Sequence, residues 1–192
     1  MIAGTVLLVL APVFLVVALL ILIASPGPVI YAQERVGKGG RVFSLLKFRS
    51  MVVNADRIGP PVSGNSDART TWLGRHLRRS KLDELPQLVN VMRGEMTLIG
   101  PRPEVARYVE YYSPSERVLL SVRPGLTGPG QLWFWTDQAC ELDDADDPER
   151  EYLEHHLHPK LALDLDYLEH RSVSRDLDVL RKTLSVMLKL RR

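Results

Sequence analysis

The N-terminal segment constrains this chain more than any other feature of the sequence. Residues Ile2 to Ala24 contain no charged side chain. As a helix that rises about 1.5 Å per residue, they would extend roughly 35 Å, enough for a bilayer hydrocarbon core of about 30 Å. The whole chain has 192 residues, 45% of them hydrophobic, which is enough for one core. The sequence therefore predicts a membrane segment over residues 1–24 and one further domain over residues 25–192.

A cleaved signal peptide is the alternative for this segment. Such a peptide needs a basic N-terminal region and a small-residue cleavage site, but no Lys or Arg precedes Arg35, and prolines follow the apolar run. The basic residues after the segment predict a body on the cytoplasmic side. They are Arg35, Lys38, Arg41, Lys47 and Arg49. The single cysteine, Cys140, excludes an internal disulfide and a cysteine-only metal site, as expected in a reducing compartment.

Pro12 lies near the middle of the apolar run. Proline lacks an N–H and clashes with the preceding turn, so we expect a kink there and no usual donor for the Leu8 carbonyl. Each half of the segment would then be about one leaflet deep. The residues alone leave two topologies open, a kinked spanning helix and a re-entrant segment that returns to the same face.

A β-hairpin is predicted directly after this segment. Two short apolar runs, residues 29–32 and 42–48, flank a glycine-rich connection in which Gly39 and Gly40 would supply positive φ angles. Lys47 and Arg49 would share one face of the second strand, because alternate residues of a strand do so. Two cations on one face can bind a phosphate or a lipid headgroup. A solvated basic edge is the alternative.

The composition then changes to a loop and a basic helix. Residues 54–67 are rich in Gly, Pro, Ser, Asn and Asp and predict a loop. Residues 69–80 predict a helix with arginines around one apolar side, formed by Trp72, Leu73, His76 and Leu77. We do not expect nucleic-acid binding, because the chain has a membrane segment and no nucleic-acid motif.

Two adjacent carboxylates, Asp83 and Glu84, follow this helix. The apolar spacing of Leu85, Leu88, Val89 and Met92 predicts a second short helix that ends near Gly94. Proline is tolerated only in a first turn, so Pro86 places the helix start at about Asp83 or Glu84. One interpretation is structural: Ser80 or Asp83 caps the helix, and Glu84 complements a dipole that stabilises each negative charge by about 0.3–1 kcal/mol.

The other interpretation of the pair is catalytic. Adjacent residues in a first turn project in different directions, so the two should not repel strongly and can have separate roles. One carboxylate can attack a phosphorus atom while the other holds a metal ion or takes a proton. Attack on a diphosphate also requires nearby cations. The candidates are Arg78, Arg79, Lys81, Arg102 in the rigid "PRP" of residues 101–103, and Arg123 in "RPGLTGPG".

Three motifs give the chain a family resemblance. "KFRSM" (47–51), "LRRSKLDELPQLVNVMRGEMTLIGPRPE" (77–104) and "RPGLTGPGQ" (123–131) follow the apolar N-terminus in this order. Together they resemble the bacterial sugar transferase family, the small monotopic phosphoglycosyl transferases, from about Val6 to the C-terminal helix. The resemblance implies transfer of a sugar 1-phosphate from a nucleotide diphosphosugar, with uridine as the expected base, to polyprenyl (undecaprenyl) phosphate. The reaction would be the first membrane step of glycan assembly, on the cytoplasmic face of the bacterial inner membrane.

The resemblance also assigns roles to residues. It makes Asp83 the nucleophile that forms a phosphosugar-aspartyl intermediate, and it gives Glu84 acceptor deprotonation or magnesium binding. Mg²⁺ or Mn²⁺ is the implied cofactor, with Asp83 and Glu84 as its ligands, and the break in a re-entrant helix falls on Ala11-Pro12. The substrate-binding candidates are Lys47, Arg49, Arg78, Pro101, Arg102, Arg123 and Gln131. Asp164 and Tyr167 fall where the family keeps an Asp and a Tyr.

Two positions depart from the family pattern. Ala11 replaces a serine whose hydroxyl could satisfy a freed carbonyl at the helix break. Pro129 replaces the tryptophan that commonly follows "TG", which changes the surroundings of Gln131. Neither departure alters the carboxylate pair.

The C-terminal third is less specific. Apolar side chains at helical spacing over residues 173–187, with basic residues around them, predict either a helix at a headgroup layer or a core helix with a basic end. Residues 133–135, "WFW", either lie at the membrane interface or fill the core. His155, His156 and His158 lack the i, i+4 spacing of a helical metal pair, so we do not expect a metal site there.

We therefore interpret the chain as an α/β protein of the α+β kind, mostly helical with a short β-hairpin and amphipathic interfacial helices. Its expected partners are a nucleotide diphosphosugar, polyprenyl phosphate and the lipid bilayer, and a homodimer is left open. The rival interpretation is a non-catalytic membrane scaffold that binds anionic lipid and uses Asp83 and Glu84 only as helix caps. A hydrolase of the same donor is the second rival.

Overall fold

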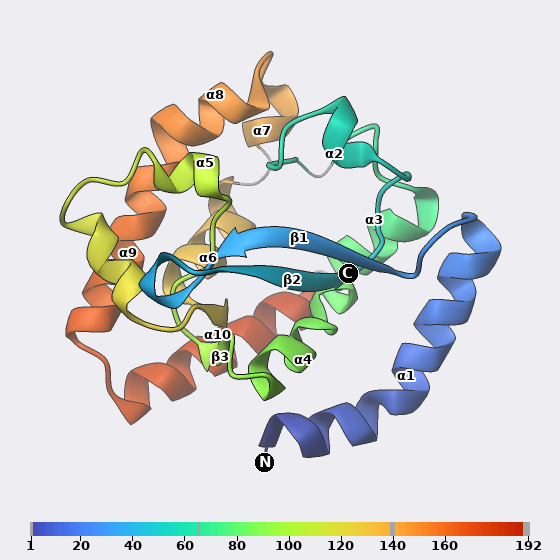
Figure 1. The fold of residues 1–192 in the computed structure, drawn as a ribbon, viewed down its shortest axis with the longest axis horizontal. Helices are drawn as coiled ribbons and strands as arrows, with labels where there is room; N and C mark the ends of the chain where they lie inside the picture. Colours follow the sequence, from blue (N-terminus) through green and yellow to red (C-terminus); the bar gives the residue numbers. More distant parts are fainter. Residues whose placement is uncertain (1, 65, 139–140, 190–192) are drawn as a thin grey trace.

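The computed structural model describes residues 2–64, 66–138 and 141–189. The described chain is mostly helical, with two small sheets, which confirms the α+β class. Figure 1 shows the β-hairpin across the middle of the molecule, with α1 (Ile2–Ala24) along the right-hand edge and α9 (Leu157–Glu169) along the left. Met1, Cys140, Arg191 and Arg192 lie outside the described residues.

Helix α1 covers Ile2–Ala24 and includes Pro12. Figure 1 shows α1 bent, and the helix continues through Ala11-Pro12 without the predicted break. Proline removes one hydrogen bond of the ladder and leaves the others in place. The helix packs on the body through Val17 and Ile21, and the ring of Phe14 lies 5.2 Å from that of Phe48.

The outward side of α1 is apolar and exposed. Its exposed side chains include Leu8, Val9, Leu15, Val16, Leu19, Leu22 and Ile23. Within the described residues, no helix combines the length and hydropathy needed to cross a membrane. Anchoring of the chain in a membrane stays a prediction.

The predicted hairpin is confirmed. Strands β1 (Ile30–Val36) and β2 (Val42–Phe48) pair antiparallel from Ile30↔Phe48 to Val36↔Val42. The tip, η1 (Lys38–Gly40), contains Gly39 and Gly40 with φ angles of 68° and 76°, a region that glycine adopts without a steric cost.

The rest of the chain surrounds the hairpin with short helices. β3 and β4 pair in parallel, with Thr97 opposite Gly125 and Ile99 opposite Thr127. In chain order the elements are α2 (Ala55–Ile58), α3 (Trp72–Arg79), the 3₁₀ turn η2 (Leu82–Glu84), α4 (Gln87–Met92), β3 (Thr97–Ile99), α5 (Ala106–Val109), the 3₁₀ helix η3 (Glu116–Ser121), β4 (Gly125–Thr127), α6 (Pro129–Trp133), the π-helix η4 (Phe134–Gln138), α7 (Glu141–Asp144), α8 (Pro148–Glu151), the π-helix η5 (Tyr152–His156), α9 (Leu157–Glu169) and α10 (Val173–Lys189).

Two predictions for the stretch after the hairpin need correction. The predicted loop over residues 54–67 contains one helical turn, α2. In α3, Leu77 is buried, but Trp72 and His76 are exposed and their rings contact each other edge to face. The apolar side of α3 is therefore narrower than its sequence spacing indicates.

Close contacts attach α3 and α4 to the second strand. A Cβ at Gly74 would lie 1.7 Å from the Ser50 carbonyl oxygen, so glycine is required where α3 crosses the chain after β2. The fully buried Asn90 side chain of α4 accepts a hydrogen bond from the Leu46 N–H at 3.1 Å and donates to the Ser44 carbonyl at 2.8 Å. Asn90 thus extends the hydrogen bonding of β2 and fixes the segment that contains the carboxylate pair.

The C-terminal helix covers the far side of the second sheet. Val179 of α10 is buried in a cluster with Ile99, Leu132 and Tyr167. Leu180 packs against this cluster, whereas Val173, Leu177 and Leu184 are exposed. The apolar residues predicted to form one face therefore divide between a packed side and an exposed one. Residues Phe134 and Trp135 pack against the core clusters, which favours the core interpretation of "WFW".

Candidate active site

The carboxylate pair lies in a tight turn. We expected a helix to begin at Asp83 or Glu84, but these residues form the separate turn η2, and α4 begins only at Gln87, after Pro86. Pro86, which has no N–H, lies between η2 and α4. The chain turns between α3 and η2 at Lys81, whose φ is positive at 57°. Such a conformation is strained for a residue with a side chain and often occurs at functional sites.

The capping interpretation of the pair is wrong. Neither η2 nor α4 has a side-chain capping hydrogen bond within the described residues. The Ser80 hydroxyl instead donates to the carbonyls of His76 and Leu77 at the end of α3. Both carboxylates are nevertheless buried, at 6% and 8% exposure for Asp83 and Glu84. A buried charge without a capping role needs another explanation.

Asp83 has an available oxygen. Its Oδ1 is buried and has no hydrogen-bond partner among the described residues. Burial, followed by the negative charge of Glu84, raises the pKa of Asp83, and the charges of Lys47, Lys81 and Arg78 oppose this rise. The negative charge of Glu84 therefore adds to the cost of the Asp83 anion. Asp83 is the less stable anion of the two.

Glu84 is held by cations. Arg102 donates to both of its oxygens, at 2.7 and 3.1 Å, and the Lys47 ammonium lies 3.7 Å from Oε1. Burial alone would raise the pKa of Glu84, but the charges of Arg102, Lys47 and Lys81 outweigh it and lower this pKa to about 2. Glu84 is therefore ionised at any physiological pH, and it is a very weak base.

The two lysines beside the pair are also perturbed. Burial lowers the pKa of Lys47 to about 8, against the charge of Glu84, and it does the same to Lys81. The Lys81 ammonium lies 4.1 Å from the ring centre of Trp135, in a cation–π contact. The positive charge around the carboxylates therefore decreases when the pH rises above about 8.

These groups line one cleft of about 450 Å³, a size typical of small-molecule sites. Of the predicted substrate-binding residues, five line it: Lys47, Arg49, Arg78, Arg102 and Gln131. Pro101 and Arg123 do not line it. Pro101 is buried, and its carbonyl accepts a hydrogen bond from the Gly125 N–H at 2.8 Å, whereas Arg123 is exposed and lines a different hollow with Lys38. The pairing of β3 with β4 therefore uses the backbone of these motifs and directs Arg123 away.

Arg49 and Arg78 are partly committed to the protein. The Arg49 guanidinium donates to the carbonyls of Ser25 and Pro26 at 2.5 and 2.9 Å, which attaches the end of α1 to the hairpin. The Arg78 guanidinium donates to the hydroxyls of Thr70 and Ser63. Each therefore fixes a wall of the cleft as well as contributing positive charge.

Gln131 lies at the floor of the cleft and is 1% exposed. In the orientation that satisfies its amide, it accepts from Arg102 at 2.6 Å and donates to the Leu126 carbonyl at 3.0 Å. Pro129 is compatible with this geometry, because it occupies the first turn of α6, where a missing N–H is tolerated. Asp164 of α9 accepts from the Gly130 N–H at 3.0 Å and so supports the same helix.

Sequence reasoning missed a second buried charge cluster in the cleft wall. Glu104 accepts hydrogen bonds from Arg35 at 3.1 Å and from the Tyr152 hydroxyl at 2.6 Å, and it also pairs with Lys160. Glu104 is the last residue of the motif "GPRPE", and its place in that motif could have indicated a role for it in the site. Lys160 gave no signal, because only the packing of α9 on the body brings it to Glu104. Tyr167, in contrast, contacts Asp176 and the C-terminal core rather than the cleft.

The cleft offers ligands for a hard cation. Mg²⁺ prefers carboxylate oxygens, and the unpartnered Oδ1 of Asp83 is such an oxygen. Both oxygens of Glu84 accept hydrogen bonds from Arg102, so Glu84 would have to share its carboxylate with a metal ion. The residues therefore fit the expected Mg²⁺, with Asp83 as the more available ligand and Glu84 as the less available one.

Comparisons with known proteins place the chain in a family. Residues 1–190 match the model of a family described as bacterial sugar transferase. A UDP-glucose:undecaprenyl-phosphate glucose-1-phosphate transferase of Caulobacter vibrioides is 38% identical over 185 residues, which are 93% of this chain and 63% of the relative. A UDP-N-acetylgalactosamine-undecaprenyl-phosphate N-acetylgalactosaminephosphotransferase of Aeromonas hydrophila is 37% identical over 93% of this chain and 40% of the relative. An exopolysaccharide production protein of Sinorhizobium fredii is 35% identical over 96% of this chain and 80% of the relative. The chain thus spans less than two thirds of the first two relatives.

The Glu84–Arg102 pair generates a stability prediction. Replacing Arg102 by Met leaves Glu84 buried without its main partner, so the free energy of unfolding at pH 7 should fall by about 3–5 kcal/mol. Arg107→Met is the control, because Arg107 pairs with Glu149 on the surface and is half exposed; it should cost at most about 1 kcal/mol. Urea unfolding measures both values. Adding Glu84→Gln to Arg102→Met should recover part of the loss, and equal losses in the two arginine variants would contradict the analysis.

Proposed function

The chain belongs to the bacterial sugar transferase family, and on that premise we propose that it transfers a sugar 1-phosphate from a nucleotide diphosphosugar to polyprenyl phosphate. The observation that carries the proposal is the buried Asp83 Oδ1, which has no partner among the described residues and belongs to a cleft lined by cations. The relatives of C. vibrioides and A. hydrophila support UDP-sugars as donors and undecaprenyl phosphate as the acceptor.

The first step is attack by Asp83. Its carboxylate oxygen forms a bond to the phosphorus that carries the sugar, and the anhydride P–O bond breaks. The electron pair leaves on the nucleoside monophosphate, and the sugar phosphate stays on Asp83 as an acyl phosphate. Lys47 and Lys81 offset the negative charge that collects at the phosphoryl group and the leaving group. Burial and the repulsion from Glu84 make Asp83 a less stable anion, and attack on phosphorus relieves both.

The second step returns Asp83 to its starting state. An oxygen of the polyprenyl phosphate attacks the same phosphorus, and the Asp83 carboxylate leaves. A phosphate monoester loses its second proton at about pH 6, so the acceptor is already an anion and needs no base. This agrees with the very low pKa of Glu84. Glu84 therefore acts by holding Arg102 and a metal ion rather than by removing a proton.

Magnesium, held by Asp83 and Glu84, would neutralise charge on the diphosphate when it is bound. The protein supplies the remaining positive charge. The Arg102 guanidinium donates hydrogen bonds to Glu84 and to Gln131. These two bonds limit the movement of the guanidinium. These contacts hold a fixed donor group at one end of the cleft.

The lipid acceptor supports a membrane location. We propose that α1 lies in the bacterial inner membrane as a re-entrant segment, with the cleft on the cytoplasmic face. The exposed apolar side chains of α1 support contact with lipid, and its bend near the middle supports a return to the same face. Arg49, which binds the carbonyls at the end of α1, would keep the cleft beside the membrane surface.

The covalent step predicts a trapped adduct. Purified protein incubated with a sugar-labelled donor and no acceptor should release one nucleoside monophosphate per chain and keep the label after denaturation. Mass spectrometry should place the label on the peptide with Asp83, and polyprenyl phosphate should discharge it. A scaffold would release no monophosphate, and a hydrolase would release it continuously.

Asp83→Asn is the decisive variant for this step. It should abolish labelling and reduce transfer to background, while the free energy of unfolding changes by less than about 1 kcal/mol. Asp146→Asn, in an exposed loop, is the control and should label like the wild type. Retained activity in Asp83→Asn, or initial-rate plots that intersect instead of running parallel, would show that Asp83 is not the nucleophile.

The pKa shifts predict a bell-shaped pH profile. The value of kcat/KM should fall on the acid side as Asp83 becomes protonated, at a pH above the usual aspartate range. It should also fall above about pH 8 as Lys47 and Lys81 lose their charge. Because arginine stays charged, Lys47→Arg should move the alkaline limb to higher pH. Lys38→Arg, at the exposed hairpin tip, should not. An unchanged limb in both Lys47→Arg and Lys81→Arg would contradict this assignment.

The re-entrant topology predicts that both ends of α1 face the cytoplasm. A cysteine placed at position 2 in a Cys140→Ser background should be protected from a membrane-impermeant thiol reagent in intact cells and should react after lysis. A cysteine in a periplasmic loop of an unrelated membrane protein serves as the labelling control. Reaction of position 2 in intact cells would establish a spanning helix instead.

A further inference from the structure

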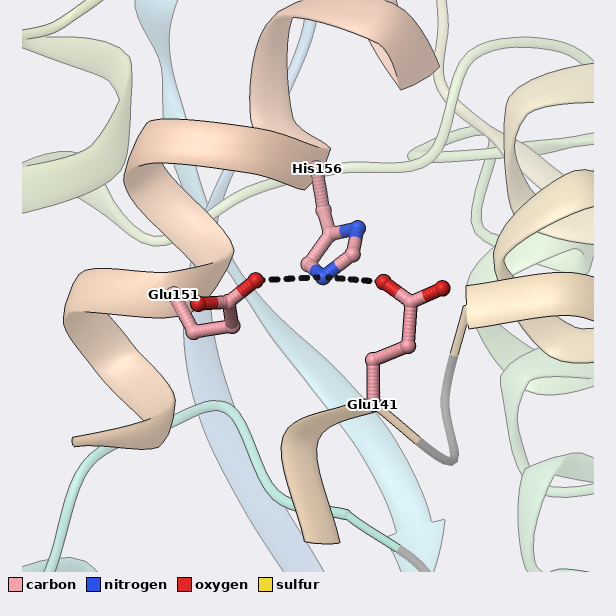
Figure 2. Close-up of side chains that lie close together, drawn as sticks. All are labelled: Glu141, Glu151 and His156. Carbon is pink, nitrogen blue, oxygen red and sulfur yellow. Dashed lines mark ion pairs between the residues drawn. The ribbon is translucent and has the colours of Figure 1, made fainter. Parts of the chain in front are cut away.

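A second group of chemically reactive side chains lies outside the cleft. Figure 2 shows the Nε2 nitrogen of His156 between the carboxylates of Glu141 and Glu151. The nitrogen lies 3.5 Å from a Glu141 oxygen and 3.7 Å from a Glu151 oxygen. One ligand atom from each side chain falls within 4.8 Å of the other two. None of these residues lines the cleft that contains Asp83.

The backbone explains how Glu151 and His156 come together. In an α-helix, residues five apart are about 140° apart around the axis and face different directions. Here residues 152–156 form the π-helix η5, in which the hydrogen bonds run from i to i+5. The wider turn brings residues 151 and 156 to the same side. The sequence expectation of no metal site counted only the α-helical i, i+4 spacing and missed this arrangement.

The His156 side chain is buried, and its ring nitrogens make no hydrogen bond to any residue that the structure describes. Its side chain is 1% exposed, and neither Nδ1 nor Nε2 has a hydrogen-bond partner among the described residues. The rings of Trp133 and Phe134 pack around it, with centres 6.2 and 5.9 Å away. A buried imidazole whose nitrogens make no hydrogen bond is rare in a folded protein.

We propose that Glu141, Glu151 and His156 bind a divalent transition-metal ion of the zinc class. Zinc is bound by imidazole nitrogen and carboxylate oxygen at about 2.0–2.1 Å, in a tetrahedral arrangement. Those bond lengths set the ligand atoms roughly 3.3–3.4 Å apart, close to the two His156 distances. The mixed nitrogen and oxygen set favours zinc over Mg²⁺, which prefers oxygen alone. Three protein ligands leave a fourth position for water.

The bound ion would connect two parts of the chain. Glu141 begins α7, whereas Glu151 and His156 belong to the α8–η5 segment. One ion would therefore hold these two segments together over the hydrophobic core. That core includes Leu142 and Tyr152, and Tyr152 also donates to Glu104 in the cleft wall. In its best-satisfied orientation the Gln138 amide donates to Glu141 at 2.9 Å, which orients that ligand as outer-shell groups commonly do. The ion therefore has a structural role, separate from the transfer reaction.

The test is zinc binding by the full chain. Tag-free protein, stripped with a chelator, is titrated with Zn²⁺ in competition with a chromophoric chelator. We expect one ion per chain, and at a hundredfold excess over Kd a rise in Tm of about 5–10 °C. Glu141→Gln and Glu151→Gln should each weaken binding at least about tenfold. His156→Phe, which keeps a ring between Trp133 and Phe134, should abolish it.

Matched controls separate this site from its neighbours. Glu154→Gln, in the same helical segment but paired with Arg150 on the surface, should bind as the wild type does. Cys140→Ser, which removes the thiol next to Glu141 in the sequence, should also bind zinc as the wild type does. If His156→Phe does not fold, zinc binding by Glu141→Gln and Glu151→Gln tests the proposal. Wild-type binding in both of them, or no zinc bound at micromolar concentration, would overturn the proposal, and neither result bears on the transferase activity.

Discussion

The burial of two adjacent carboxylates is the constraint on which the rest of this structure depends. A charge removed from water destabilises a fold unless cations and hydrogen bonds replace the solvent. Here the cations come from separate parts of the chain: Lys47 from β2, Lys81 from the turn after α3, and Arg102 from the loop after β3. The turn that carries Asp83 and Glu84 is therefore stabilised by the hairpin, by the turn after α3 and by the loop after β3 together.

The two carboxylates differ because their partners differ. Glu84 has a bidentate arginine and a pKa of about 2, whereas Asp83 has a buried oxygen without a partner and a raised pKa. A well-neutralised carboxylate is a poor nucleophile, and a destabilised one gains most from forming a bond. In the mechanism that we propose, the same environment fixes Glu84 as a positioning group and leaves Asp83 as the nucleophile. Neighbouring titratable groups with opposite pKa shifts are typical of acid–base and nucleophilic sites.

Sequence reasoning predicted the parts of this site that depend on local pattern. The long apolar helix, the hairpin with its glycine tip, and five of the seven substrate-binding candidates in the cleft follow from spacing and motif. Sequence reasoning failed where contacts between distant parts of the chain determine the position of a residue. The positive φ of Lys81 turns the chain between α3 and the carboxylates, and the pairing of β3 with β4 turns Arg123 outward. Glu104 and Lys160 are 56 residues apart, and only the packing of α9 joins them.

Irregular helix geometry explains why the positions of Trp135 and His156 were not predicted. Spacing rules assume α-helical geometry, in which i and i+4 share a face. Within the described residues the chain forms π-helical turns at η4 and η5, and such turns are frequent at functional sites. In η4 the turn includes Trp135, which packs under the Lys81 ammonium, and in η5 it includes His156. Both irregular turns therefore orient groups that regular helices would have pointed elsewhere, one toward the cleft and one toward the glutamates.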